Sequence, residues 1–122
     1  MTVPILKQGS VLIACVQSAL TDGELSQLRD ELAQGIGRYR ATGVIVDVSA
    51  VDVLDSFGSR TLRSIVFIAR LRGAETVVVG IQPEVAYAMV QLGLTMEGIA
   101  TALDMEEGLA LLHAVPRARR GV

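Results

Sequence analysis

Residues 43–48, Gly-Val-Ile-Val-Asp-Val, constrain the fold of this chain more than any other segment. Their consecutive β-branched side chains are typical of a strand that is buried on both faces, because a half-exposed strand alternates apolar and polar residues. Residues 75–81 have a similar composition, with one threonine and three valines at their centre. Strands buried on both faces occur in sheets covered by helices, so the sequence predicts an α/β protein with a mostly parallel sheet.

Four amphipathic or well-capped segments supply the predicted helices. A capping box, in which two side chains three residues apart cap each other's backbone N–H groups, is predicted at Thr21 with Glu24 and at Asp104 with Glu107. Pro83 is placed where helices favour proline, at the first helical position. The predicted helices cover residues 21–40, residues 56–72, residues 83–92 and a segment that begins at residue 104.

The first two strands, residues 3–7 and 11–16, flank a Gln-Gly-Ser turn and so predict a hairpin with one antiparallel strand. With a short strand at residues 98–102, the predicted order is β-β-α-β-α-β-α-β-α, with right-handed crossovers between the parallel strands. We expect one domain over residues 1–115. Residues 116–122, which carry Arg117, Arg119 and Arg120, are expected to form a disordered basic tail.

The composition argues against several classes of partner. The net charge of −2 provides no electrostatic basis for binding nucleic acid. Apolar runs are far shorter than the ~20 residues of a membrane-spanning helix, and the sequence has no secretory signal pattern. We therefore expect a soluble, cytoplasmic bacterial protein that binds neither nucleic acid nor membranes.

The residues of common catalytic and metal sites are also missing from the sequence. A single cysteine, Cys15, and a single histidine, His113, cannot build a zinc cluster, and no G-x-S-x-G elbow supports a Ser-His-Asp triad. Gly35 and Gly37 lie late in a predicted helix and do not follow a strand, so they are not a nucleotide loop. We expect no catalytic residues, no metal, no cofactor and no enzymatic turnover.

Residues 47–56 form the most specific candidate site. Asp47, Asp52 and Asp55 follow a buried strand at its carboxyl end, where open α/β sheets place their sites. One interpretation is a Mg²⁺ site for phosphoryl transfer to aspartate, as in receiver domains. Receivers also use an acidic pair after the first strand and a late lysine, whereas the sole lysine here is Lys7.

Two other interpretations concern the helix that follows this loop. Asp55 and Ser56 could serve only as helix caps. Alternatively, Ser56 could be a phosphoacceptor, because the N–H groups and the dipole at a helix N-terminus stabilise an added phosphate.

A stripe on the same helix extends this candidate site. Within about 60° of Ser56 on a helical wheel lie Ser59, Arg60, Arg63, Phe67 and Arg70. The arginines can reach a phosphate or an acidic partner surface. Phe67 is either an interface residue or a residue packed under a neighbouring helix.

Several segments resemble the STAS family, the sulfate-transporter and anti-sigma-factor-antagonist domain. The motif consists of Asp47-Val48-Ser49 with Val51, followed by Asp55-Ser56. Across essentially the whole chain, the sequence is similar to the RsbS-like branch, the small antagonist subunits of the bacterial stressosome. The segments that carry this likeness are residues 3–9, 55–57, 80–84, 92–94 and 101–109. Phe57 departs from the small residue usual in direct anti-sigma-factor antagonists, which favours the stressosome branch.

The resemblance implies a mixed sheet with helices packed on one side. It also implies a non-catalytic scaffold that sequesters an RsbT-like serine/threonine switch kinase until the kinase phosphorylates it on Ser56, with Ser59 as the alternative position. Implied partners are RsbR-like paralogues with sensor domains in a large stressosome assembly, and homo-oligomers are expected. The expected partner-binding residues are Asp47, Asp52, Asp55, Phe57, Arg60, Arg63 and Phe67.

Two other functions remain open from the sequence. The chain could be a direct anti-sigma-factor antagonist, which belongs to the same class of binding protein. It could instead be a small-ligand or nucleotide-binding domain.

Overall fold

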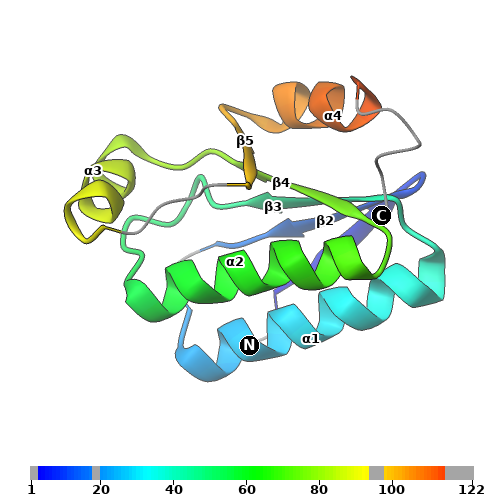
Figure 1. Cartoon of the computed structure of the whole chain (residues 1–122), viewed down its shortest axis with the longest axis horizontal. Coiled ribbons are helices and arrows are strands. Elements are labelled where there is room, and N and C mark those ends of the chain that lie inside the picture. The colour runs from blue at the N-terminus through cyan, green and yellow to red at the C-terminus, as the bar shows by residue number, and fades with distance from the viewer. Residues whose placement is uncertain (1–2, 18–19, 94–97, 115–122) are drawn as a thin grey trace.

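The sheet is mixed, as the sequence predicts (Figure 1). The structure is a computed structural model that describes residues 3–17, 20–93 and 98–114. Within these ranges, strands run in the order β1-β2-β3-β4-β5, with β1 antiparallel to β2 and all other neighbours parallel. Their bounds are Ile5–Gln8 (β1), Val11–Cys15 (β2), Gly43–Asp47 (β3), Glu75–Val79 (β4) and Ala100–Ala102 (β5).

The described helices are Asp22–Tyr39 (α1), Ser56–Leu71 (α2), Pro83–Gln91 (α3) and Met105–Ala114 (α4). The capping box of α1 is confirmed: Thr21 Oγ1 accepts from the N–H of Glu24, and the Glu24 carboxylate accepts from the N–H of Thr21. At α4, Asp104 accepts from the N–H of Glu107 as predicted. The Glu107 carboxylate, however, accepts from the N–H of Leu103, one residue before the expected donor.

Helices cover both faces of the sheet, so the implied one-sided arrangement is wrong (Figure 1). α1 and α2 pack on one face, whereas α4 packs on β3, β4 and β5 from the opposite face. Alternate residues of β3 divide between two apolar clusters: Val44 and Val46 face α1 and α2, and Ile45 faces α4. The second helical layer forms because each central strand is apolar on both faces.

α3 lies near the carboxyl ends of the central strands, at the same end of the sheet as the N-terminus of α2 (Figure 1). The predicted tail, residues 116–122, falls outside the described residues. No helix in the described ranges is long and apolar enough to cross a membrane.

Glycine allows α4 to approach the sheet closely. A Cβ added at Gly108 would lie 2.6 Å from Cγ1 of Val79, and one added at Gly43 would lie 2.9 Å from Cδ1 of Leu112. A side chain at Gly108 would meet the stiff Val79 side chain and push α4 away from the sheet, whereas one at Gly43 would meet methyl groups of Leu112 that can move.

We predict that Gly108→Ala lowers the free energy of unfolding by about 1–3 kcal/mol, because the new methyl group overpacks the α4 interface. The matched control is Gly23→Ala in α1, where an added Cβ meets nothing within 4 Å. This control should be neutral or stabilising by up to about 1 kcal/mol, because alanine is the better helix former. Urea unfolding of both variants measures the difference. A Gly108→Ala protein as stable as the control would contradict the close packing of α4.

Candidate functional site

Hydrogen bonds within the loop from β3 to α2, and one bond to β4, hold the start of this loop. Oδ1 of Asp47 accepts from the N–H of Ser49 at 2.9 Å and from its Oγ at 2.7 Å. The N–H of Val48 donates to the carbonyl of Val79 at 3.0 Å, which extends the contact between β3 and β4 by one residue. Asp47 therefore shapes the start of the loop.

A second connection ties this loop to the segment between β4 and α3. Nε2 of Gln82 donates to the carbonyl of Ser49 at 2.7 Å. Gly80 has a φ of +78°, and a Cβ on it would lie 2.7 Å from Cβ of Ser49. Sequence reasoning missed this contact, and its only signal was that residues 80–84 resembled the stressosome branch.

Asp55 is the N-cap of α2, and Ser56 is the first residue of that helix. Oδ1 of Asp55 accepts from the N–H of Gly58 at 2.7 Å, and its carbonyl accepts from the N–H of Ser59 at 3.0 Å. The predicted capping role of Asp55 is confirmed. The Ser56 side chain is half-buried at the start of the helix, where N–H groups favour an anion.

Ser59 occupies a different environment although it lies on the same stripe. Its side chain is 5% exposed, and its Oγ has no hydrogen-bond partner in the described part of the chain. A phosphate on this hydroxyl would bury a charge, which is costly without partners. The geometry therefore favours Ser56 over Ser59 as a position that another protein can reach.

The three carboxylates of the loop serve separate roles. Asp47 binds Ser49, Asp55 caps α2, and Asp52 is exposed on the loop. Across residues 3–17, 20–93 and 98–114, no group of three or more His, Cys, Asp or Glu side chains is placed to hold a metal ion. The Mg²⁺ interpretation of this loop finds no support in the arrangement of these carboxylates.

Cys15 lies beside Asp47 in the paired strands β2 and β3. Burial raises the pKa of the Cys15 thiol, and the negative charge of Asp47 raises it further. A higher pKa keeps less of the thiol in its reactive thiolate form, so Cys15 acts mainly as a small apolar residue.

Phe67 lies on the outer side of α2 with 37% of its surface exposed. The guanidinium carbons of Arg63 and Arg70 lie 5.7 and 5.5 Å from its ring centroid, within the range of cation–π contacts. Nη2 of Arg70 also donates to the carbonyl of Gly98 at 3.0 Å. This exposure disfavours the expected packing of Phe67 under a neighbouring helix and leaves its role as an interface residue a prediction. The ring lies between arginines, and Arg60 is exposed one turn after Ser56.

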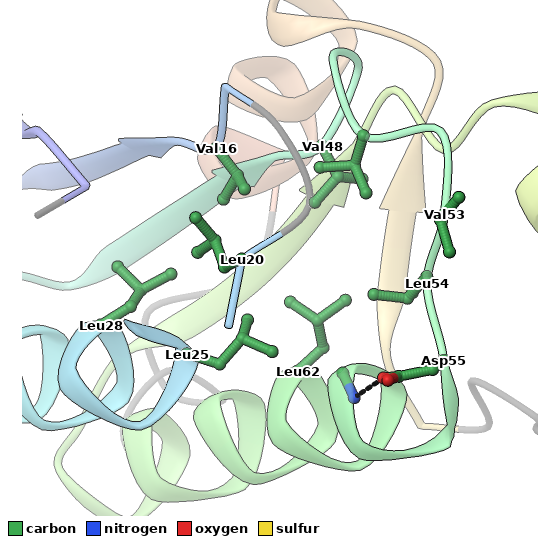
Figure 2. Close-up of a pocket in the computed structure, with 11 residues that line it drawn as sticks. Val16, Leu20, Leu25, Leu28, Val48, Val53, Leu54, Asp55 and Leu62 are labelled. Carbon is green, nitrogen blue, oxygen red and sulfur yellow. Dashed lines mark hydrogen bonds between the residues drawn. The ribbon is translucent and has the colours of Figure 1, made fainter. Parts of the chain in front are cut away.

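An apolar pocket of about 80 Å³ lies under the loop at the N-terminal end of α2 (Figure 2). It is bounded by the end of β2, α1, the β3–α2 loop and α2. Its lining residues are Val16, Leu20, Leu25, Leu28, Val48, Val51, Val53, Leu54, Asp55, Gly58 and Leu62. Sequence reasoning missed the pocket because its walls come from four segments that no single periodic pattern connects.

The sequence that forms this mixed sheet and the capped α2 matches one known family. The STAS domain family matches residues 2–107, and the chain belongs to this family. Among curated relatives, the RsbT co-antagonist protein RsbRA of Bacillus subtilis is 26% identical over 83 residues, and RsbRC of the same organism is 35% identical over 73 residues. These matches cover 68% and 60% of this chain, but only 30% and 26% of the relatives.

Solved structures of similar length extend the comparison. A serine-to-glutamate variant of RsbS from Moorella thermoacetica is 35% identical, with a TM-score of 0.79, and the match covers 91% of this chain and 94% of that one. A chain from a structure of the stressosome, described as a signal integration and transduction hub, is 33% identical with a TM-score of 0.74, covering 90% and 96%. The anti-sigma factor antagonist SpoIIAA is 14% identical and shares the fold.

We predict that Asp55→Ala lowers the free energy of unfolding by about 1 kcal/mol, because α2 loses its N-cap. Asp55→Asn should retain most of the stability, because its amide oxygen can still accept from the N–H of Gly58. The control is Asp52→Ala, which removes an exposed carboxylate from the same loop and should change stability by less than about 0.5 kcal/mol. Thermal and urea unfolding test this order of stabilities. Equal losses of unfolding free energy in Asp55→Ala and Asp52→Ala would contradict it.

Proposed function

We propose that this chain is an RsbS-like antagonist and scaffold subunit of a stressosome. It catalyses no reaction, assembles with RsbR-like paralogues and holds a switch serine kinase until that kinase phosphorylates Ser56. The observation that carries the proposal is the 35% identity to RsbS over nearly the full length of both chains. The matches to RsbRA and RsbRC support assembly with paralogous STAS proteins.

The environment of Ser56 supports its role as phosphoacceptor. It is the first residue of α2, and its neighbours on the loop are held in place by the Asp55 cap. Phosphorylation would add roughly −1.5 to −2 charge beside Asp52 and Asp55. The helix N-terminus stabilises part of that charge, so the fold survives, whereas a docked partner meets a more negative and bulkier surface.

The other loop and stripe hydroxyls are less suited to phosphorylation. Oγ of Ser49 donates to the Asp47 carboxylate at 2.7 Å, and a phosphate there would face that carboxylate directly. Ser59 is buried. These contacts support Ser56 as the phosphorylated residue. A kinase could reach Ser59 only if the start of α2 opens.

The remaining predicted partner-binding residues surround Ser56 or follow it along α2. Asp52 and Asp55 supply exposed negative charge on the loop, and half-buried Phe57 follows Ser56 directly. Further along the helix, Phe67 with its flanking arginines provides an apolar surface with basic edges. We propose that Asp47 contributes indirectly, because its carboxylate holds Ser49 and thereby the loop.

The alternative of a direct anti-sigma-factor antagonist has weaker support. SpoIIAA shares 14% identity with this chain, and a likeness at that level shows the fold alone. RsbS shares 35%, and the bulky Phe57 also favours the stressosome branch.

We predict that Ser56→Ala abolishes phosphorylation by the switch kinase while leaving kinase binding intact. Phosphorylation of Ser56 should weaken kinase binding about 5- to 150-fold. Ser56→Asp should weaken it less, because aspartate carries less charge than phosphate. The measurement is phosphopeptide mapping after incubation with the kinase and ATP, together with calorimetric titration without ATP.

The controls for this prediction are Ser49→Ala and Ser59→Ala, which should be phosphorylated like the wild type. Phosphate found on Ser49 or Ser59 in a folded Ser56→Ala protein would reject Ser56 as the phosphoacceptor.

A separate prediction concerns Phe67 as an interface anchor. Phe67→Ala should weaken binding to the kinase or to an RsbR-like paralogue by about 2 kcal/mol, with a melting temperature close to that of the wild type. Arg60→Ala and Arg63→Ala should have smaller effects, mainly on association rate. The control is Tyr87→Ala, which removes an exposed aromatic side chain from α3. If Phe67→Ala instead lowers the melting temperature sharply and leaves binding to both partners unchanged, Phe67 is a core residue.

A further inference from the structure

The pocket at the N-terminal end of α2 has an almost wholly aliphatic lining (Figure 2). Leu54 projects from the loop toward Leu62 of α2, and Leu25 of α1 closes the lower side. Among the described residues of the lining, the charged one is Asp55, and its Oδ1 already accepts from the N–H of Gly58. Polar occupants would lose their hydrogen bonds to water without replacement, so the pocket favours an apolar occupant.

The size of the pocket limits that occupant to a few carbon atoms. Its volume is about 80 Å³. Sites for drug-sized molecules and cofactors are typically about 300–1,000 Å³, and an apolar cavity of about 150 Å³ binds benzene. The enclosed space is therefore too small to bury a whole nucleotide or drug-sized metabolite, whereas the end of one leucine, isoleucine or methionine side chain fits.

The location of the pocket places it under any protein that covers Ser56. Asp55 and Gly58, which lie on either side of Ser56 in the chain, both belong to the lining. A helix with its side chains is only about 10–12 Å across. A standard protein interface covers roughly 800 Å² on each partner, which corresponds to a disc of about 16 Å radius. The pocket thus falls within the footprint of a kinase docked on Ser56.

The rim carries the features of a contact surface. The side chain of Val53 is 63% exposed at the edge of the pocket, so apolar surface continues outward from it. The neighbouring Asp52 is exposed and negatively charged. An apolar anchor with a basic residue beside it would complement both features.

We propose that this pocket receives one aliphatic side chain of the serine kinase, from a segment that also presents a basic residue to Asp52. The inference rests on the proposed function and adds the anchor site that positions the kinase for Ser56. Phosphorylation then acts on the anchor as well as on the surface charge. A phosphate on Ser56 competes with the Asp55 carboxylate for the N–H groups of α2, and displaced Asp55 moves Leu54, a wall of the pocket.

The test is to fill the pocket from the side that lies away from the loop. Leu25→Phe adds a ring from α1 and leaves residues 48–58 unchanged. We expect the variant to bind the kinase at least about tenfold more weakly than the wild type in titration calorimetry without ATP, because the anchor side chain is excluded. Thermal unfolding must show that the variant is folded. Val51→Ile, which adds one methylene group, serves as a milder second variant with a smaller loss of affinity.

The matched control is Leu111→Phe on α4, on the opposite face of the sheet, which should bind the kinase like the wild type. Folded Leu25→Phe and Val51→Ile proteins with wild-type affinity, in samples where Ser56 is still phosphorylated, would overturn the anchor pocket and leave the proposed function standing. A wild-type chain that neither binds the kinase nor is phosphorylated would overturn both. A stoichiometric aliphatic molecule extracted from the purified chain, with kinase affinity independent of its removal, would make the pocket a small-molecule site and overturn the inference.

Discussion

β3 and β4 are apolar on both faces, so each must be central in the sheet and covered by helices on either side. This burial determines where the remaining elements lie. α1 and α2 cover one face and α4 the other, with Gly43 and Gly108 allowing α4 to approach closely. The loops at the carboxyl ends of the strands are then the part of the molecule left to carry a site. Because β3 is fixed on both faces, the loop that follows it starts from a rigid position.

The Asp55 cap holds the start of α2 in place at the end of this loop. Its hydrogen bond to the N–H of Gly58 fixes the first turn of the helix, and a Cβ at Gly58 would lie 2.7 Å from Cδ1 of Leu54. The cap Asp55, the proposed phosphoacceptor Ser56 and the pocket-wall residue Leu54 are consecutive in the chain. A change in charge at Ser56 therefore acts on a small set of contacts at one end of the apolar cluster that lies under α1 and α2.

The sequence predicted the order of elements and the caps because those depend on local patterns. The β-branched runs, the Thr21 and Glu24 pair, and the placement of Pro83 each lead to an element that the structure contains. The α4 layer was misplaced because the resemblance implied helices on one side, although the two-sided apolar character of residues 43–48 already required cover on both. At the site, capping by Asp55 was one of three interpretations that the sequence left open, and the structure shows that Asp55 caps α2. The Ser49–Gln82 contact and the pocket could not be predicted, because they join segments that are distant in sequence and depend on the tertiary fold.

α2 carries two proposed contact regions at different distances from Ser56, the proposed phosphoacceptor. At 1.5 Å per residue, Phe67 lies about 16 Å along the helix from Ser56. Charges on the surface are largely screened beyond about 8 Å at physiological ionic strength. A phosphate on Ser56 therefore acts strongly on the loop and pocket and only weakly on Phe67 and its arginines. One stiff helix can thus hold a phosphorylation-sensitive contact at its N-terminus and a phosphorylation-insensitive contact three turns further on, which is what a scaffold needs if it is to release a kinase and remain assembled.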